Sequence, residues 1–540
     1  MHPCLSVQEL LSIIFAHLKL GSKNTLVALA RTCKTFQEPA LNELYAEVEG
    51  FDCFLQCLPR TLWVINLGKL NFTRPMDPRD WCTLQNYARR VQTLCYDSRH
   101  YYAPCIEEEV FRSLCFCPTS ALFPKIQKVV WEHAPDYSTH FIRFIIGPIV
   151  NYVSTTFNPL LMHSYASLGI MCPNITSFHL HARRFSKDIP SLPSNLLHMW
   201  KRLENVSIAQ PSLSNLQHLA SLKSLKTLSI SWNFPPKKMT KQDFGENTFS
   251  QLRHLSIHSY KSLAICSNLL ESMSETAISP NTLELRAEEV VDDYSFSRLI
   301  SLLTEKCSHQ DMHSITIRAN TKKDGSHIVN LPAFRPLLSF KNLTHFSVRC
   351  PDTFDLNDQG LKEIATAWPH LEVLDMASSW VWDRRPRITL PGLIPLLAHC
   401  PHLHTLSLGI DATRPITTFV RPGNGVCNTL ICSLRLGGSP IRHPLDVAAF
   451  LSNIMPCVRE IINDPQGGVD KYYKRWCAVA KAVPAFASVR KEERTRSDLK
   501  LEYDSGGDGD GDGEDDDERD STPTSDSSFD SSSSSLLDYL

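Results

Sequence analysis

The sequence predicts an α/β chain in which a small three-helix unit precedes a long solenoid of parallel strands and outer helices. Three observations predict it: helical spacing of apolar residues near the N-terminus, a short aliphatic pattern that recurs every 22 to 32 residues, and an acidic C-terminal run rich in Ser, Asp and Gly. We place the helical unit at residues 1–50, a helical linker packed on the solenoid at 51–90, and the solenoid at 91–464. A capping helix at 465–503 and a disordered tail at 504–540 follow.

The first fifty residues are expected to form three short helices. The apolar residues of the first helix follow i, i+3 and i+4 spacing, and they are Leu10, Leu11, Ile13, Ile14 and Leu18. Ser6 can cap this helix while Glu9 completes a capping box, and Gly21 can end it. A third short helix spans about 39–45. Three helices of this length enclose a very small core, so we expect the unit to dock on a partner.

The residues of these helices form a set that is found in a known family. The set comprises Leu5, Glu9, Leu10, Leu11, Ile14, Phe15, Leu18, Leu26, Leu29, Cys33, Lys34, Phe36, Leu44 and Tyr45. It resembles the F-box motif, and the run 28–45 is especially similar to F-box proteins of mushroom-forming fungi, the basidiomycetes. Leu5-Ser6 stands where Leu-Pro is usual, and Phe36 and Tyr45 stand where Trp is common. The resemblance implies binding to the Skp-type adaptor of an SCF-type cullin-RING ubiquitin ligase.

The resemblance also implies which residues contact the adaptor or support that contact directly. They are Leu5, Leu10, Ile14, Phe15, Leu18, Leu26, Leu29, Leu44 and Tyr45. Some of them must instead form the core of the helical unit, and the sequence alone does not divide the two sets. An ordinary helical cap on the repeat array is the alternative interpretation, because amphipathic helices are common.

The repeat pattern is weak in the first part of the array. Pro75, Pro78 and Asp80 precede a helical stretch at about 81–87, which we place in a packing layer between the helical unit and the array. Early aliphatic triplets begin at Val91, Ile126 and Ile175. The intervals from each of these to the next triplet are 35, 49 and 28 residues, so the first repeats are expected to be long or interrupted.

From residue 203 onward the pattern is regular: an aliphatic residue, two others, an aliphatic residue, one other, and an aliphatic residue. Its clear instances begin at Leu203, Leu225, Leu252, Met312, Leu343, Leu371, Leu403 and Ile431, a degraded one begins at Val458, and Pro280 with Leu283 and Leu285 fills the gap between Leu252 and Met312. Each is expected to form a short strand whose alternate side chains point into the stack. A helix is expected on the outer side between strands, as at residues 358–365. The pairs Cys172-Pro173 and Cys400-Pro401 each lie just before an expected strand. These repeats resemble leucine-rich repeats of the cysteine-containing kind, which implies parallel strands on a concave side.

The end of the chain combines a predicted helix with a strongly charged tail. Aromatic and basic residues around 472–476 predict a closing helix, which a solenoid needs. Residues 504–540 hold 13 acids and one base, so residues 1–503 carry a net charge of +10 although the whole chain sums to −2. The Asp residues at 508, 510 and 512 imitate a calcium loop, but Arg519 occupies the place of the required Glu. A disordered tail is therefore predicted.

Other features favour an intracellular protein of the cytoplasm, the nucleus or both. The N-terminus has no basic region or cleavage site of a secretory signal, and the longest apolar stretch, 141–153, is too short to span a bilayer. Membrane association is therefore not expected. Eighteen cysteines are scattered without any CxxC pair, and we interpret them as reduced, mostly buried thiols.

No catalytic, metal or cofactor site is predicted, because no nucleophile elbow, Walker loop, HExxH helix or kinase signature occurs. His399, His402 and His404 are interpreted as surface histidines, and His254 and His258 lie too far apart along a strand to share a metal. Basic residues do not gather in a stripe, which disfavours nucleic acid as a partner.

The helices and the repeats together predict a non-enzymatic substrate receptor. The F-box-like helices would bind the Skp-type adaptor of the cullin-RING ligase, and the repeats would offer a concave sheet to a protein substrate that the sequence does not identify. The alternative is a ligase-independent repeat scaffold that binds a protein or nucleic acid partner.

Overall fold

A computed structural model describes most of the chain. The described residues are 7–19, 23–99, 103–158, 162–181, 197–232, 244, 248–273, 278–290, 293–320, 328–349, 353–376, 385–416, 422–436, 438–462 and 472–504. The chain forms two compact units, residues 1–487 and residues 488–540. The predicted disordered tail, from residue 505 on, lies outside the described residues, as do Leu5, Ser6 and Gly21.

Three helices occupy the N-terminal part, as α1 (Gln8–Lys19), α2 (Lys23–Thr32) and α3 (Lys34–Ala46). Their core consists of Leu11, Phe15, Leu26 and Ala40, which are all nearly or fully buried. The ring of Phe15 meets the ring of Phe36 edge to face, with centroids 5.7 Å apart. This cluster is separate from the main core, so the helices enclose a small core of their own.

Side chains of α3 fasten the helical unit to the rest of the chain. The buried guanidinium of Arg90 donates to both carboxylate oxygens of Glu38, at 2.9 and 2.7 Å. The ring of Tyr45 lies 4.8 Å from that of Tyr87. Strand β1 (Glu47–Glu49) follows α3 directly and pairs in parallel with β4 (Thr93–Asp97). The long sheet therefore begins inside the segment that the sequence assigned to the helical unit.

A mixed layer follows, made of α4 (Phe51–Leu55), β2 (Trp63–Asn66), β3 (Lys69–Phe72) and α5 (Pro78–Ala88). Strands β2 and β3 form an antiparallel hairpin, and β5 (Cys105–Ile106) pairs in parallel with β3. The hairpin turn holds Leu67 and Gly68 at φ values of 50° and 73°. Leucine rarely occupies such a position, so the turn signal is hidden in the sequence. The expectation of a purely helical layer over 51–90 omitted this hairpin.

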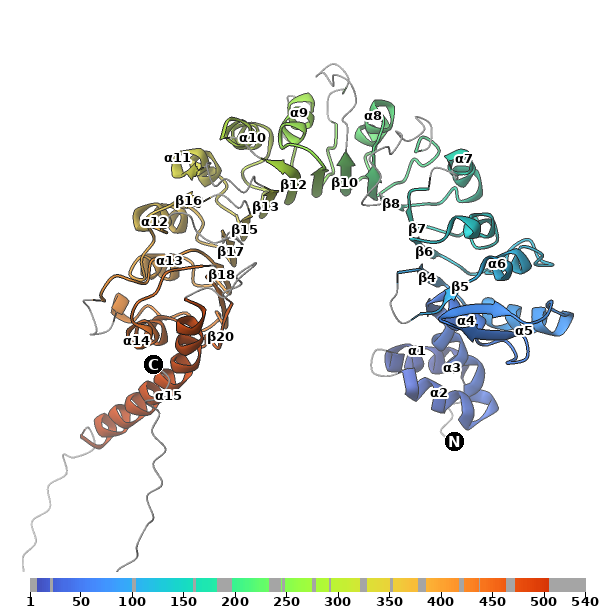
Figure 1. Cartoon of the computed structure of the whole chain (residues 1–540), viewed down its shortest axis with the longest axis horizontal. Helices are drawn as coiled ribbons and strands as arrows, with labels where there is room; N and C mark the ends of the chain where they lie inside the picture. Colours follow the sequence, from blue (N-terminus) through green and yellow to red (C-terminus); the bar gives the residue numbers. More distant parts are fainter. Residues whose placement is uncertain are drawn as a thin grey trace, which may run out of the picture. The chain divides into compact units, whose positions relative to one another are not determined.

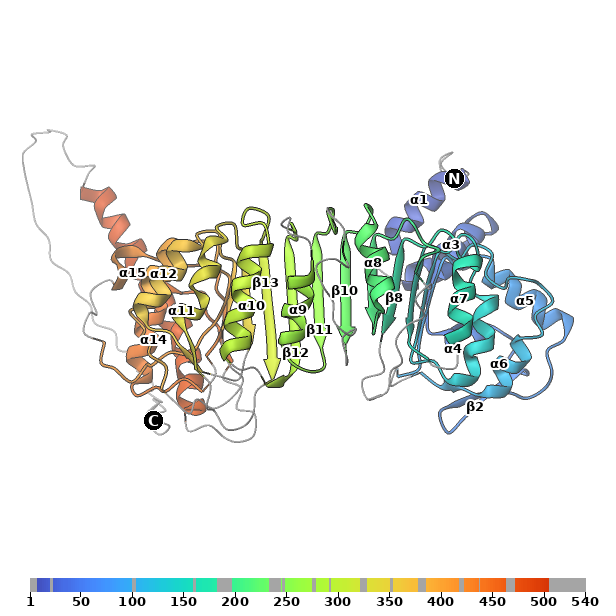
Figure 2. The ribbon, with the colours of Figure 1, turned by 90° about the horizontal axis from the view of Figure 1, so that it is seen from above.

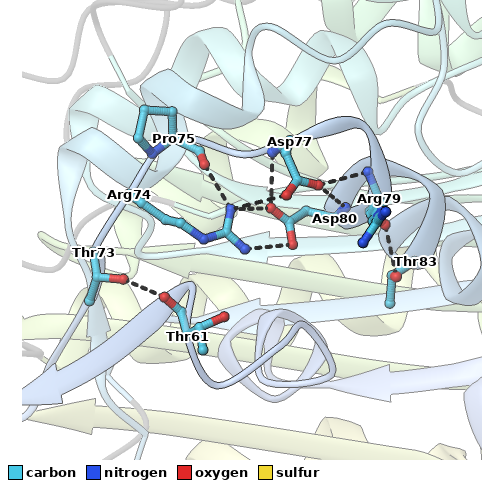
Figure 3. A network of polar contacts seen from close by, with 8 residues as sticks. All are labelled: Thr61, Thr73, Arg74, Pro75, Asp77, Arg79, Asp80 and Thr83. Carbon is cyan, nitrogen blue, oxygen red and sulfur yellow. Dashed lines mark hydrogen bonds and ion pairs between the residues drawn. The ribbon is translucent and has the colours of Figure 1, made fainter.

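The N-terminus of α5 is held by a network of charges (Figure 3). The side chain of Asp77 accepts hydrogen bonds from the backbone N–H groups of Arg79 and Asp80, at 2.8 and 3.0 Å. In return, the buried carboxylate of Asp80 accepts from the backbone N–H of Asp77 at 2.9 Å, which completes a capping box. The Arg74 guanidinium donates to both oxygens of Asp80, at 2.5 and 3.1 Å.

The Asp80→Asn variant is expected to lose a pH-dependent part of the stability. The Arg74 guanidinium lowers the pKa of Asp80, and the hydrogen bond from Asp77 acts in the same direction. Because this folded pKa lies below the unfolded value of about 3.9, the stabilisation is complete above that value and is lost as the pH falls through the folded pKa. Urea unfolding at about pH 7 and about pH 3 should show the stability gap between wild type and variant shrinking at low pH. An equal gap at both pH values would contradict this role.

One parallel sheet of 15 strands runs through the rest of the chain, and its strands are hydrogen-bonded in sequence order. Besides β1 and β4 the sheet contains β6 (Lys128–Glu132), β7 (Tyr152–Thr156), β8 (Ser177–His181), β9 (Asn205–Ala209), β10 (Thr227–Trp232), β11 (His254–Ser259), β12 (Thr282–Val290), β13 (Ser314–Asn320), β15 (His345–Arg349), β17 (Val373–Asp375), β18 (Thr405–Ser407), β19 (Ser433–Arg435) and β20 (Glu460–Ile462). The predicted α/β solenoid is confirmed.

Helical segments connect these strands on the outer side. They are α6 (Glu108–Leu114), η2 (Asp136–Phe144), α7 (Met162–Met171), α8 (Leu213–Ser221), α9 (Ala264–Ser272), α10 (Asp293–Lys306), α11 (Leu331–Phe334), η5 (Arg335–Ser339), α12 (Asp358–Ala367), α13 (Leu393–His399), η6 (Pro422–Gly425) and α14 (Pro444–Ile454). A small parallel pair, β14 (Ile328–Asn330) and β16 (Thr353–Asp355), lies in these connections. Within residues 1–487 the strands line the inner side of a curved array and the helices cover its outer side (Figures 1 and 2).

The regular triplets from Leu203 to Val458 all coincide with strands of the long sheet. The early interval of 49 residues, however, contains β7. The prediction of one long or interrupted repeat in this interval is therefore wrong. Val150 and Val153 are buried and begin the repeat of β7, but Thr155 stands where the pattern has a third aliphatic residue. The interval therefore divides at Val150 into repeats of 24 and 25 residues.

Cysteines at the ends of outer helices take part in the packing. Cys400 is buried, and its thiol donates to the carbonyl oxygen of Trp368 at 3.4 Å. Burial raises the pKa of the Cys400 thiol to about 12, so it remains an uncharged donor. The interpretation that most cysteines are buried is wrong: four of the sixteen described cysteines are buried, and all sixteen are free thiols. The others are partly buried or exposed, and Cys53 on α4 and Cys82 on α5 lie on exposed sides of helices.

The last helix, α15 (Tyr473–Asp504), contributes Trp476, Val479 and Val483 to the main core. The indole N–H of Trp476 donates to the carbonyl oxygen of Ser439 at 2.8 Å. No helix in the described part of the chain combines enough length with enough apolar character to cross a bilayer.

Candidate functional site

Helix α1 carries an apolar face that the rest of the described chain leaves uncovered. Leu10, Ile14 and Leu18 have exposed fractions of 42%, 40% and 36%, although leucine and isoleucine are among the residues most often buried. Their i, i+4, i+8 spacing places them on one side of the helix. Leu11 and Phe15 point to the other side, into the small core. The helix is therefore apolar on two sides, and only one of them is packed.

Nine residues are predicted for adaptor contact, and the eight that the structure describes divide into three groups. Leu10, Ile14 and Leu18 are exposed on α1. Phe15 and Leu26 are core residues, and Leu29 and Leu44 pack against that core. Tyr45 is half-buried against Tyr87, and its hydroxyl lies 3.3 Å from the thiol sulfur of Cys57. Leu5 lies outside the described residues.

One further exposed residue of α1, Ile13, extends this face, while Val7 just before α1 and Val27 on α2 are also exposed apolar side chains. We call the exposed side chains of Leu10, Ile13, Ile14 and Leu18 the α1 apolar face. Ile13 belongs to the predicted helical pattern but not to the residues predicted for adaptor contact. A helical wheel drawn with Leu11 and Phe15 as the buried side places Ile13 on the opposite side.

The inner face of the sheet is the second candidate surface. Its central row consists mostly of small hydroxyl side chains, which lie at equivalent register positions on neighbouring strands. They are Ser154, Ser207, Ser229, Ser256, Thr316, Ser347 and Ser407. A hollow of about 670 Å³ lies over this row between β6 and β13. Small side chains keep its floor open, and their hydroxyls can donate and accept hydrogen bonds.

A second row lies two residues further along each strand. Its side chains are acidic on the first strands and basic near the other end of the hollow. Asp97 and Glu132 are register partners on β4 and β6. The corresponding positions of β12, β13 and β15 hold Arg286, Arg318 and Arg349. Arg286 contacts Glu288 at 3.1 Å and Arg349 contacts Asp375 at 2.6 Å. Arg318 is exposed and has no ion-pair partner among the described residues.

The histidines considered in the sequence are separated by the fold. His254 and His258 lie four residues apart on β11, and His258 contacts the carboxylate of Glu288 at 3.2 Å. His399 ends α13, whereas His402 and His404 are exposed and precede β18. The ring of His404 contacts the hydroxyl of Thr405 at 3.0 Å. The interpretation of these three as surface residues fits their exposure.

Comparison with known proteins adds little to this picture. No protein-family model matches the chain. No curated protein matches it. Among solved structures, a leucine-rich-repeat protein of Leptospira interrogans has 12% identity and a TM-score of 0.35, and the match covers 66% of this chain and 80% of that one. The Rad7 and Elc1 complex in yeast has 13% identity and a TM-score of 0.32, with 68% and 88% covered. The repeat fold assigned above rests on the strands and helices of this chain.

Proposed function

We propose that the chain is a substrate-receptor subunit of an SCF-type cullin-RING ubiquitin ligase. The α1 apolar face supports this proposal most directly, because it is an unpaired apolar surface on a helical unit that resembles an F-box. A Skp-type adaptor would cover Leu10, Ile14 and Leu18, while Leu11 and Phe15 hold the helix in place. The chain would act in the cytoplasm, the nucleus or both.

The inner face of the sheet is the proposed binding surface for the target protein. It offers a hydroxyl-lined hollow with carboxylates at one end and arginines at the other. A target with basic groups facing the carboxylates and acidic groups facing the arginines would therefore fit it. The chain would perform no chemistry itself. Holding a lysine-bearing target near a charged ubiquitin carrier raises the effective concentration of the reacting groups.

The Ile14→Asp variant is expected to weaken adaptor binding at least tenfold. Covering the 40% of Ile14 that is exposed contributes about 0.6–1.2 kcal/mol, a share of the roughly 1.5–3 kcal/mol for full burial, and about 1.4 kcal/mol corresponds to a factor of ten in Kd. The substitution also places a charge in the contact. Purified Skp-type adaptor titrated into the full chain, followed by calorimetry, measures the change. Ile14 is preferable to Phe15 because aspartate at the buried Phe15 would disrupt the helical core itself.

A matched control is Ile170→Asp on α7, where the isoleucine is 75% exposed and far along the chain from α1. It should leave adaptor binding unchanged. If the wild-type chain does not bind the adaptor, or if both variants weaken binding equally, the ligase proposal fails. The second candidate function, a ligase-independent repeat scaffold, would then remain, because the polar inner face of the sheet does not depend on the adaptor.

A further inference from the structure

Four side chains of the kinds that bind metals converge at one end of the inner face. Asp97 ends β4, Glu132 ends β6, His133 follows it, and His181 ends β8. Parallel register brings them to the same level, because Asp97 pairs with Glu132, and Thr156 of the intervening β7 pairs with His181. The strands lie side by side on the inner side of the array (Figure 1).

The distances between three of the donor atoms suit a small coordination sphere. One ligand atom each of Asp97, Glu132 and His133 lies within 4.8 Å of the other two, and His181, which is outside this set, approaches Glu132. His133 Nδ1 is 3.3 Å from Asp97 Oδ1, and His181 Nε2 is 3.6 Å from Glu132 Oε1. In a tetrahedral zinc site with metal–ligand bonds of about 2.0–2.1 Å, neighbouring ligand atoms lie roughly 3.3–3.5 Å apart. Both measured separations are close to that value.

His133 is held in an unusual conformation that directs its ring toward the carboxylates. Its φ is 50°, in the left-handed region that a residue with a Cβ rarely adopts. Its backbone N–H donates to the hydroxyl of Thr156 at 2.8 Å, and its carbonyl accepts from the hydroxyl of Ser98. These two bonds fix the residue. Strained positions of this kind cluster at ligand-binding and active sites.

The Nδ1 atom of His133 lacks an ordinary partner. It is buried, and despite its proximity to Asp97 it makes no hydrogen bond with acceptable geometry. A ring nitrogen without a hydrogen bond can bind a metal ion through its lone pair.

The two carboxylates are also held in position by hydrogen bonds from other residues. The hydroxyl of Ser154 donates to Glu132 Oε1 at 2.7 Å, and Arg99 donates to Asp97 Oδ1 from its backbone N–H and to Asp97 Oδ2 from its guanidinium, both at 3.0 Å. Burial acts to raise the pKa of Asp97, but the hydrogen bonds from Arg99 outweigh it, so the pKa lies below its usual value. Partners of this kind orient the ligands in metal sites.

From this geometry we infer that Asp97, Glu132 and His133 form a binding site for a divalent transition-metal ion of the Zn²⁺ class, with His181 beside Glu132 as the fourth ligand. Two imidazoles and two carboxylates are a donor set that suits zinc or cobalt better than the all-oxygen sites of calcium and magnesium. Glu132, His133 and His181 also line the hollow on the inner face, which gives the ion an entry path. The ion would join three repeats at the surface proposed for the target.

Cobalt binding to the full chain tests the site, with Co²⁺ as the only added metal. The wild-type chain should bind it with tetrahedral ligand-field absorption and without the charge-transfer band of a thiolate ligand, which separates this site from the cysteines. Glu132→Gln should weaken this binding at least tenfold. Glu284→Gln is the matched control, because Glu284 is an exposed carboxylate that lines the same hollow.

Zn²⁺ should displace the bound Co²⁺ and remove the absorption. Far-ultraviolet circular dichroism of the Glu132→Gln variant should match the wild type, since a disrupted fold would also abolish binding. If it does not match, Asp97→Asn replaces it. The inference fails if the wild type binds no Co²⁺, if the spectrum shows thiolate ligands only, or if Glu284→Gln weakens binding as much as Glu132→Gln. None of these outcomes depends on adaptor binding.

Discussion

Replacing Phe51 with alanine should destabilise the first repeats by about 3–5 kcal/mol, the usual cost of removing a buried aromatic side chain. Phe51 begins α4 and is fully buried. Its ring centroid lies 5.3 to 6.3 Å from those of Phe54, Tyr96, Phe111, Trp131 and Phe141. These rings come from α4, β4, α6, β6 and η2, so one side chain holds five elements together. A cavity at this point cannot be filled without moving several of them.

Urea unfolding measures the total loss, and hydrogen exchange locates it. Because each repeat of a solenoid contacts mainly its neighbours, β4 and β6 should lose protection while β18 and β19 keep it. Phe116→Ala is the matched control, since Phe116 is 80% exposed and should contribute less than about 0.5 kcal/mol. Similar losses for the two variants, or a uniform loss of protection along the array, would show that the aromatic cluster does not organise the first repeats.

The sequence predicts the regular part of the fold well because its signal is local. From β9 to β19 each strand of the long sheet carries its own apolar triplet with buried side chains, whereas the degraded triplet of β20 keeps Val458 and the partly buried Ile461. Earlier strands depart from this pattern. Thr155 replaces the third aliphatic residue of β7, and Leu67 occupies a turn position that usually signals itself by glycine or asparagine. Both elements are determined by neighbouring strands, and no single segment contains that information.

The two candidate sites could likewise be predicted from the sequence only in part. Apolar residues cover most of the circumference of α1, so the spacing predicts a helix but not which side is buried. Packing of Leu26 and Ala40 decides it, by covering Leu11 and Phe15. The four side chains of the inferred metal site come from segments that are 35 and 49 residues apart. Only the register of β4, β6, β7 and β8 brings them together, and β7 was the strand that the pattern missed.

Replacing Trp476 with alanine should open the C-terminal end of the array, at a cost of about 3–5 kcal/mol. The indole is fully buried and donates to the carbonyl oxygen of Ser439, and the adjacent Arg475 donates to the carbonyl of Ile441 at 2.7 Å. Both acceptors lie after β19, in a segment outside the long sheet that an isolated β-bridge joins to Ala412. Removing the indole therefore leaves a cavity and a buried carbonyl without its partner, which adds about 1–3 kcal/mol when water cannot reach it.

Two further variants separate the contributions of volume and hydrogen bonding. Trp476→Phe keeps most of the ring and loses the donor, so it should cost about 1–3 kcal/mol. Tyr473→Ala lies one turn earlier on α15, at a residue that is 44% exposed, and should change little. Hydrogen exchange of α14 and β20 should follow the same order, with Trp476→Ala the largest. If Trp476→Ala lowered the free energy of unfolding no more than Tyr473→Ala, α15 would not close the core. The last repeat would then be stable with one side uncovered, which contradicts the dependence of each repeat on its neighbours.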